Sequence, residues 1–274
     1  MNLDPSKQLN IFSHELELIN LIKLYSNNDL PNKILFSGEK GIGKCTLAYH
    51  LINYILSLDE EYSYDLKNFK ILLDNKSSKL IQNKSSPNFI LVDIEDDKRS
   101  IDINQIRNLI LKLNKSSFNT KPRFVLIDNV ELLNISAINA LLKIIEEPND
   151  NINFILINNN KKILPTLKSR CLNFKIKLTK KQSIDITNMI LKRNYKEFLN
   201  EELVNNYSTP GELLRLIDFG NNNDIDLVKS NLKDVIKIII INKLYNKDTY
   251  IKDLIYSLIE IYFRNNISVS NLKL

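Results

Sequence analysis

The stretch KILFSGEKGIGKCTLAYHLINYILSL, residues 33–58, joins an apolar run, a glycine-rich loop and a helical pattern without a break. The apolar run is 33–38, the loop has the frame Gly-x-x-x-x-Gly-Lys, and the helical pattern covers 46–58. A strand that enters such a loop and opens a helix is typical of a phosphate-binding loop. The alternative is a glycine turn that merely connects the strand to the helix.

The loop residues predict a cradle for nucleotide phosphates. The backbone N–H groups from Gly41 to Lys44 would surround phosphate oxygens, and the Lys44 ammonium would reach the terminal phosphates. Cys45 stands where a hydroxyl residue normally binds Mg²⁺, a hard ion that prefers oxygen ligands, and Thr46 would point elsewhere on the helix. We therefore expect ATP as the possible cofactor, with Mg²⁺ held less well. The candidate binding residues are Gly38, Gly41, Ile42, Gly43, Lys44, Cys45, Thr46 and Asp128.

Working outward, apolar runs of strand length alternate with helical patterns. The runs are continuous rather than alternating, which favours strands buried on both faces of a parallel sheet with right-handed crossovers. We expect Ser136 or Asn134 to cap the last helix and Pro148 to end it, and the polar segment 59–86 to be a surface excursion. The further strands are predicted at 88–95, 123–130 and 153–159, and the further helices at 14–26, 104–114 and 135–147.

The third run, RFVLIDNV, ends in a carboxylate. Asp128 there would lie near a bound metal ion, directly or through water, whereas the alternative is an acid that caps the next turn. Active ATPases in which a buried strand ends in such an aspartate carry a glutamate at the next position, but this chain has Asn129. An amide cannot accept a proton, and Glu131 lies two residues too far along to replace the missing carboxylate.

The pattern changes after Cys171. We predict three short helices from 180–194, 200–207 and 211–220, with Pro210 at a start and Gly220 at a stop. Two longer helices follow at 226–245 and 249–265. No internal repeat of fixed period is found.

Composition restricts the function classes. No apolar run is long enough for a membrane span and no secretory signal is found, so we expect a cytoplasmic protein. Two separated cysteines without a CxxC pair exclude a cysteine-based zinc site, and no metal site is predicted. The two histidines, His14 and His50, are interpreted as incidental. The formal net charge of +6 would suit a nucleic-acid partner, but the lysines are interpreted as scattered, which is weak support.

Several longer sequence motifs resemble those of a known protein family. NALLKIIEEP and LPTLKSRC, together with the glycine loop, SSPNFILVD, IDINQIRNL and VLIDNVELL, occur in this order. The chain resembles the delta prime subunit family of bacterial DNA polymerase III, AAA+ members of the clamp loader. The resemblance is good over residues 11–178, fair to 220 and weak beyond.

The resemblance implies a fold and a role. The fold is α/β: an AAA+ phosphate-loop domain with a five-stranded parallel sheet over 1–178, a three-helix lid over 179–220, and a short all-α collar over 221–274. The role is to load the sliding clamp on primer-template DNA during replication, within a ring of gamma/tau ATPase subunits and a delta subunit. The implied catalytic residue is Arg170, an arginine finger supplied in trans to ATP on a neighbouring subunit. Without the resemblance, Arg170 reads as a surface arginine.

The chain departs from the family pattern at several places. The ATPase relatives carry a sensor arginine where this chain has Gly211, and Arg215 lies one helical turn later. The usual glycine before His14 is Ser13, the four-cysteine zinc module of many relatives is missing, and only some fifty residues follow the lid.

Three functions remain open. The first is a delta prime subunit that does not hydrolyse ATP itself, although it belongs to an enzyme classed as a nucleotidyltransferase. The alternative is an active AAA+ motor subunit, similar to gamma/tau. A general DNA-binding replication protein is the third.

Overall fold

The computed structural model describes residues 3–95, 98–115, 119–146, 151–204, 208–246 and 249–266. The chain divides into two compact units between Lys177 and Leu178. The first unit holds every strand of the described chain and the second is helical. Pro148, the predicted end of a helix, lies outside the described residues.

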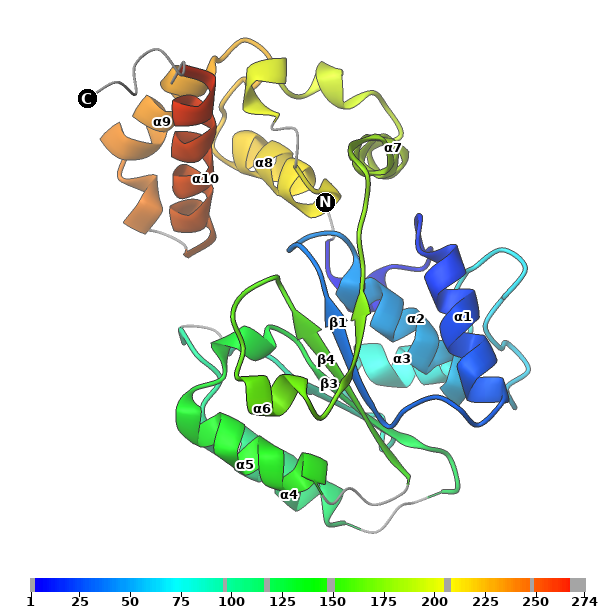
Figure 1. Cartoon of the computed structure of the whole chain (residues 1–274). Helices are drawn as coiled ribbons and strands as arrows, with labels where there is room; N and C mark the ends of the chain where they lie inside the picture. Colours follow the sequence, from blue (N-terminus) through cyan, green and yellow to red (C-terminus); the bar gives the residue numbers. More distant parts are fainter. Residues whose placement is uncertain are drawn as a thin grey trace. The chain divides into compact units, whose positions relative to one another are not determined.

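The first unit is built on a parallel sheet with strand order β2-β3-β4-β1-β5 (Figure 1). This confirms the predicted five-stranded parallel α/β architecture. Ile34 in β1 lies opposite Ile155 in β4 and Leu172 in β5. The strand that leads into the glycine loop, β1, is therefore flanked by a strand on each side. The strands are β1 Lys33–Ser37, β2 Phe89–Val92, β3 Arg123–Ile127, β4 Ile152–Asn158 and β5 Leu172–Lys175.

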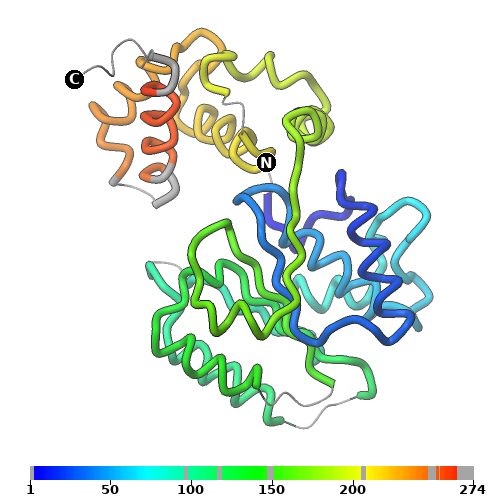
Figure 2. The backbone as a smooth tube through the Cα atoms, viewed as in Figure 1, coloured from blue at the N-terminus to red at the C-terminus, as the bar shows by residue number. Residues whose placement is uncertain are grey.

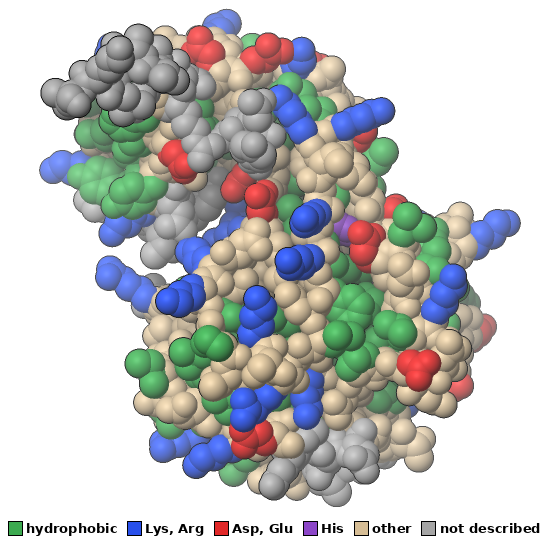
Figure 3. Space-filling view, in the orientation of Figure 1, with side chains coloured by type: hydrophobic (Ala, Val, Ile, Leu, Met, Phe, Trp, Pro, Cys, Tyr) green, Lys and Arg blue, Asp and Glu red, His purple; other side chains and the backbone are tan. Residues whose placement is uncertain are grey.

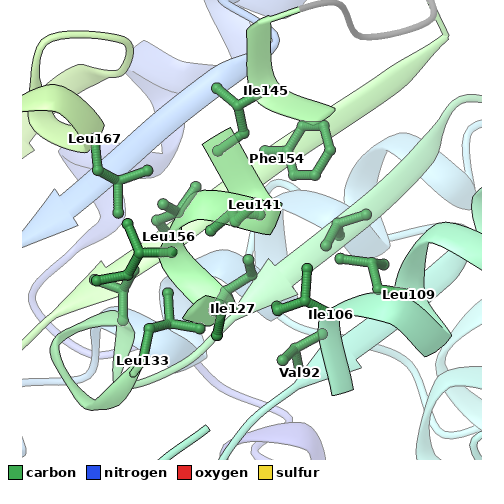
Figure 4. Close-up of a cluster of buried hydrophobic side chains, with 14 of the residues drawn as sticks. Val92, Ile106, Leu109, Ile127, Leu133, Leu141, Ile145, Phe154, Leu156 and Leu167 are labelled. Atoms are coloured by element: carbon green, nitrogen blue, oxygen red, sulfur yellow. The ribbon is translucent and has the colours of Figure 1, made fainter. Parts of the chain in front are cut away.

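Helices lie on both faces of the sheet, as the continuous apolar runs require (Figures 1 and 2). Successive strand residues point to opposite faces, so Phe154 and Leu156 pack with α4 and α5, whereas Ile155 points to the other side. Figure 4 shows this cluster and shows Leu167 of α6 joining it. The helices of this unit are α1 Glu15–Ser26, α2 Lys44–Leu56, α3 Lys76–Gln82, α4 Ile103–Leu113, α5 Ile135–Glu146 and α6 Pro165–Lys168.

Local signals explain the helix starts. Asn134 accepts a hydrogen bond from the Ala137 N–H at 2.8 Å, so Asn134 rather than Ser136 caps α5. Asp102 and Gln105 form a reciprocal capping box at the start of α4. The helix after the glycine loop begins at Lys44, two residues earlier than predicted.

The segment 59–86 is more than a surface excursion, so that expectation was wrong. It contains α3, and its Tyr64 and Ile71 are buried. Asn75 caps α3 through Ser78 N–H and accepts a hydrogen bond from Asn53 of α2 at 2.8 Å. Polar residues of this segment therefore form a buried hydrogen-bonded contact between α2 and α3. The periodicity of apolar residues cannot reveal such a contact.

The second unit, from Leu178 onward, has one continuous hydrophobic cluster. Its members come from both predicted subdomains, for example Leu213 and Phe219 before residue 220 and Val235 and Ile239 after it. The division into a lid and a collar at 220 therefore stays a prediction. The helices are α7 Lys180–Leu191, α8 Pro210–Asn222, α9 Leu232–Ile241 and α10 Thr249–Asn266.

The helix predicted over 226–245 begins only at Leu232 and ends at Ile241. Two further helix expectations in this unit need correction. The predicted helix over 200–207 is a single 3₁₀ turn, Glu201–Leu203, within its described residues. The other concerns Gly220, because α8 continues to Asn222. A Cβ on Gly220 would lie 2.5 Å from a Leu227 methyl carbon, so the glycine permits close packing rather than ending the helix. None of the helices in the described part of the chain is long and apolar enough to cross a membrane.

Candidate functional site

The glycine loop leaves β1 in a confined place between two strands. The Gly38 N–H donates to the Asn158 carbonyl of β4 at 3.2 Å. A Cβ on Gly38 would lie only 2.3 Å from the Ile176 carbonyl oxygen, just after β5. Position 38 therefore needs a residue without a side chain, and the loop is fixed where it starts.

The loop then turns so that its amides can face a ligand. Gly41 and Gly43 have φ angles of 87° and 92°, in the left-handed region that glycine adopts without strain. Gly43 is the N-cap of α2, and no side chain caps the first amides of this helix. The first N–H groups of α2 therefore have the arrangement that binds phosphate at a helix N-terminus.

His14 supports the loop from the start of α1, which corrects its interpretation as incidental. Its ring is 2% exposed, and Nε2 lies 2.6 Å from the Ile42 carbonyl. The ring also lies about 3.5 Å from the place of a Gly43 Cβ. Nε2–H is therefore the donor, and the imidazole holds the carbonyl side of the loop outward from the phosphate side.

His50, the other residue interpreted as incidental, is also buried. Its Nδ1 lies 2.8 Å from the Tyr64 hydroxyl, and Nε2 lies 3.2 Å from the Gln8 carbonyl. Burial lowers the pKa of His50 to about 4, so the ring is neutral near pH 7. His50 ties α2 to its neighbours and has no contact with the loop in these bonds.

The Lys44 side chain closes the loop on itself. Its ammonium donates to the Gly38 carbonyl at 2.9 Å and also to the Glu39 carbonyl. Burial lowers the Lys44 pKa to about 8, although Asp128 and Glu131 nearby favour the charged form. The cation is thus held at the loop, ready to exchange carbonyl oxygens for phosphate oxygens.

Binding of phosphate should therefore weaken as Lys44 loses its proton. Between pH 7 and pH 9 we expect ATP affinity in EDTA to fall about tenfold, in proportion to the protonated fraction of a group with a pKa near 8. Because this pKa is lower than in the unfolded chain, folding becomes more favourable over the same range, so unfolding cannot cause the loss. Fluorescent-nucleotide titration measures it, and a Lys44→Gln variant should lack the pH dependence. Equal slopes in both proteins would contradict this assignment.

Cys45 and Asp128 face each other where a metal ion would lie. The Cys45 thiol forms a hydrogen bond with Asp128, and burial followed by the charge of Asp128 raises the thiol pKa well above its usual value. Burial and the charge of Asp93 raise the Asp128 pKa to about 6. The Cys45 thiol is neutral and is hydrogen-bonded to the Asp128 carboxylate. This pair is therefore a poor set of ligands for Mg²⁺.

Cys45→Ser should therefore improve nucleotide binding through the metal alone. We expect ATP affinity to rise several-fold in Mg²⁺ and to change little in EDTA, because only the hydroxyl can serve as an oxygen ligand. Isothermal titration in both buffers gives the two values. Cys171→Ser, the same change at the other free cysteine, is the control. An equal gain in both buffers would rule out a metal role for position 45.

A polar network joins the carboxyl ends of β2, β3 and β4. Asn129 has a φ of 57° and donates from Nδ2 to Asp93 at 2.8 Å, while its Oδ1 accepts from Asn159 at 2.9 Å. Asn159 Nδ2 also donates to Glu131 at 2.8 Å. Glu131 is thus engaged next to β4, which agrees with the expectation that it does not replace a glutamate at 129.

Asp93 and Asn159 were not among the predicted site residues. Each follows a strand directly, and carboxyl ends of parallel strands share one edge of the sheet. Polar residues immediately after the apolar runs were therefore the signal that could have found them. Thr46, by contrast, lies half-buried on α2 and takes part in no hydrogen bond of this network.

Arg170 lies apart from the loop. It follows α6 and precedes Leu172, which pairs with Ile34 near the start of β1, whereas Gly38 follows the end of that strand. The separation is about 13 Å for four residues of strand, longer than an arginine side chain. The Arg170 side chain is 35% exposed, and its guanidinium pairs with Glu146 and donates to the Thr166 carbonyl at 2.7 Å.

The residues present suit a phosphate chain better than they suit a metal ion. The uncapped start of α2, the left-handed glycines and Lys44 fit a triphosphate, which Gly38, Ile42 and Gly43 would shape. Cys45 and Asp128 fit Mg²⁺ poorly. No group of three or more His, Cys, Asp or Glu side chains that could hold a metal ion occurs among the described residues.

With the geometry established, comparison with known proteins gives the family. A family model described as DNA polymerase III, delta subunit, matches residues 14–180, more than half of the chain. The chain belongs to this family. The match runs from the histidine under the loop through Arg170 to the first residue of α7, so it includes the whole α/β unit that holds the site.

Individual relatives are also subunits of DNA polymerase III. The chain is similar to DNA polymerase III subunit delta' of Buchnera aphidicola subsp. Schizaphis graminum, 31% identical over 160 residues, which are 58% of this chain and 46% of that one. It is also similar to the gamma subunit of the same organism, 33% identical over 189 residues, or 67% and 50% of the two chains. The chain thus spans about half the length of these relatives.

Among solved structures, the chain is similar to a Bacillus subtilis DNA clamp loader delta protein, with 17% identity, a TM-score of 0.37 and coverage of 92% and 73%. It is also similar to the Thermotoga maritima RuvB Holliday junction branch migration motor, with 15% identity, a TM-score of 0.47 and coverage of 87% and 73%. These values are too low to carry an argument about function.

Proposed function

We propose that this chain is a delta prime subunit of the DNA polymerase III clamp loader. In this role it does not hydrolyse ATP, and it supplies Arg170 in trans to ATP on a neighbouring gamma/tau subunit. With a delta subunit it forms a hetero-oligomeric ring in the cytoplasm that loads the sliding clamp on primed DNA. The family match and the delta' relatives support this role.

One observation carries the proposal. The position after Asp128, where a water-orienting carboxylate would be needed, holds an amide tied to Asp93 and Asn159. Arg170 is at the same time exposed and too far along the sheet to serve its own loop. A phosphate loop without a base, together with an outward arginine, suits a subunit that completes another subunit's site.

The chemical contribution of this chain is therefore electrostatic. A guanidinium near a γ-phosphate meets negative charge that grows as the phosphoryl group departs, so it stabilises the transition state more than the ground state. To act, Arg170 must exchange Glu146 and the Thr166 carbonyl for phosphate oxygens. The exchange replaces one charge-assisted bond by another, which keeps its net cost small.

The similarity to a gamma subunit favours a second candidate, an active motor. The purified chain distinguishes the two. We expect its ATP turnover to remain at the buffer background at saturating ATP, because position 129 holds an amide and Glu131, among the described residues, is bonded to Asn159. Mixed with gamma/tau and delta subunits, it should raise their ATPase in the presence of clamp and primed DNA. Turnover by the chain alone, absent from a Lys44→Ala control, would favour the motor.

A further inference from the structure

The buried ring of His14 has one nitrogen that the described residues leave without a hydrogen-bond partner. His14 is 2% exposed, and its Nε2–H donates to the Ile42 carbonyl at 2.6 Å. Its Nδ1 is shielded from solvent and is unpaired within the described part of the chain. Figure 3, in which histidines are purple, shows almost no histidine surface on the viewed face. An unpaired buried nitrogen costs free energy, so the neutral ring is an incompletely satisfied state of the site.

A carboxylate lies close to this unpaired nitrogen. Glu17 Oε2, one helical turn further along α1, is 3.9 Å from Nδ1, which is too long for a hydrogen bond. The Glu17 side chain is 36% exposed and makes no other ion pair or hydrogen bond among the described residues, so it is free to approach the ring. A neutral ring that donates from Nε2 presents only a lone pair to Glu17. A doubly protonated ring would donate to the Ile42 carbonyl and to Glu17 at once.

Charges of both signs surround the ring in the empty loop. The ionisable side chains on the three segments that meet at the ring are Glu15 and Glu17 on α1, Glu39 and Lys40 in the loop, and Lys44 at the start of α2. The acids favour a charged ring, whereas the lysines oppose it. The positive end of the α2 dipole also opposes it, because the ring lies about 3.5 Å from the place of a Cβ on Gly43, the N-cap of α2.

A phosphate chain in the loop would reverse this balance. Phosphate oxygens at the first amides of α2 would offset Lys44 and the helix dipole, which are the features that oppose a charged ring. The negative phosphates would also attract an imidazolium on the other side of the loop backbone. A charged Nε2–H donor would in turn hold the Ile42 carbonyl more strongly than a neutral one does. His14 acts on the ligand only through this carbonyl, so it is a positioning residue and not a phosphate ligand.

We propose that the glycine loop binds nucleotide phosphate together with a proton, which His14 accepts at Nδ1 and donates in a hydrogen bond to Glu17. The proton comes from solvent. In the empty loop the ring is neutral and Nδ1 is unpaired, whereas in the occupied loop both ring nitrogens donate and the support beneath Ile42 is complete. The inference rests on the phosphate-binding role that the proposed function leaves to this loop, and it does not depend on Arg170.

Ring-nitrogen NMR of the full chain tests this without any substitution. The chain has only two histidines, and His50 stays neutral at pH 6.5 because burial lowers its pKa to about 4. Addition of ATP in EDTA at this pH should move the other ring, His14, from the neutral tautomer toward the imidazolium. A His14 ring with the same protonation state before and after ATP binds would overturn the proposal.

Calorimetry in buffers of different ionisation enthalpy counts the protons that are taken up with ATP. Between pH 7 and pH 6, wild-type affinity should rise about threefold more than that of His14→Gln, which corresponds to about half a proton per nucleotide. The glutamine amide keeps an N–H donor for the Ile42 carbonyl but takes no proton, and protons bound by ATP itself are common to both proteins. Glu17→Gln should show the same loss. Glu15→Gln is the matched control, because Glu15 accepts from the Ser13 N–H instead.

The outcomes separate this inference from the proposed function. Parallel pH profiles of wild type and His14→Gln would overturn the proton uptake and leave His14 as a structural support. Absence of ATP binding by the wild-type chain would also overturn it, even if Arg170→Ala still lowered the ATPase of the assembled complex. Proton uptake that depends on His14 and Glu17, with no effect of Arg170→Ala on ATPase, would keep this inference and reject the finger.

Discussion

Arg170→Ala is expected to abolish ATP hydrolysis at one site of the assembled clamp loader while leaving the ring intact. An arginine supplied in trans is worth about a thousandfold or more in rate, because it meets charge that develops only in the transition state. Only one ATP site of the ring would face this subunit, so total ATPase should fall partially unless the sites are coupled. Clamp loading on primed DNA should slow as well.

The measurement compares complexes assembled with wild-type and variant chains, after gel filtration shows equal assembly. Arg170→Lys should not restore activity, because an ammonium cannot reproduce the planar fork of the guanidinium. Arg107→Ala, which removes an exposed arginine of α4 in the same unit, is the matched control. Wild-type ATPase and clamp loading with Arg170→Ala would exclude the finger.

Lys44→Ala is expected to lower ATP affinity of the isolated chain about a hundredfold. A hydrogen bond to a charged group contributes about 1.5–3 kcal/mol, and the loop amides that remain are the weaker part of the cradle. Equilibrium dialysis with labelled ATP gives the affinity. Lys40→Ala changes a lysine of the same loop at an exposed position and should have little effect.

Stability must be followed in the same variant. Lys44 is 3% exposed, and its removal leaves the Gly38 and Glu39 carbonyls without this donor. Thermal unfolding will show whether the fold survives. If the folded Lys44→Ala variant binds ATP as well as the wild type does, the loop is a structural turn rather than a phosphate site.

The apolar runs in the sequence were sufficient to predict a parallel sheet, but they did not reveal all of its strands. Apolar runs such as FVLI (124–127) are buried and are visible in the sequence, whereas the residues of β5, Leu172–Lys175, are exposed or half-exposed at the sheet edge. An edge strand needs no apolar run, so only the family resemblance led to a fifth strand. α3 was missed for a related reason, because its start depends on amide contacts such as Asn53 to Asn75.

The candidate site was predicted unevenly. The loop and Asp128 could be predicted because strand, glycine and lysine occur in sequence order. His14 could not, since its bond to the Ile42 carbonyl spans 28 residues and depends on how α1 packs. The residue before it, Ser13, has a φ of 59°, a left-handed conformation that would suit the glycine that the resemblance implies at this position.

The amide network at the sheet edge determines what a catalytic carboxylate at position 129 would need around it. A carboxylate in place of Asn129 would lie within hydrogen-bond distance of Asp93, where the amide now donates at 2.8 Å. Two adjacent carboxylates disfavour each other's ionised form, and the bond that Asn129 accepts from Asn159 would be disturbed at the same time. A working base at position 129 thus requires correlated substitutions at the ends of separate strands. A glutamate placed at position 129 alone would therefore lie among groups that oppose its ionised form, and this chain's phosphate loop would gain no effective base from that single change.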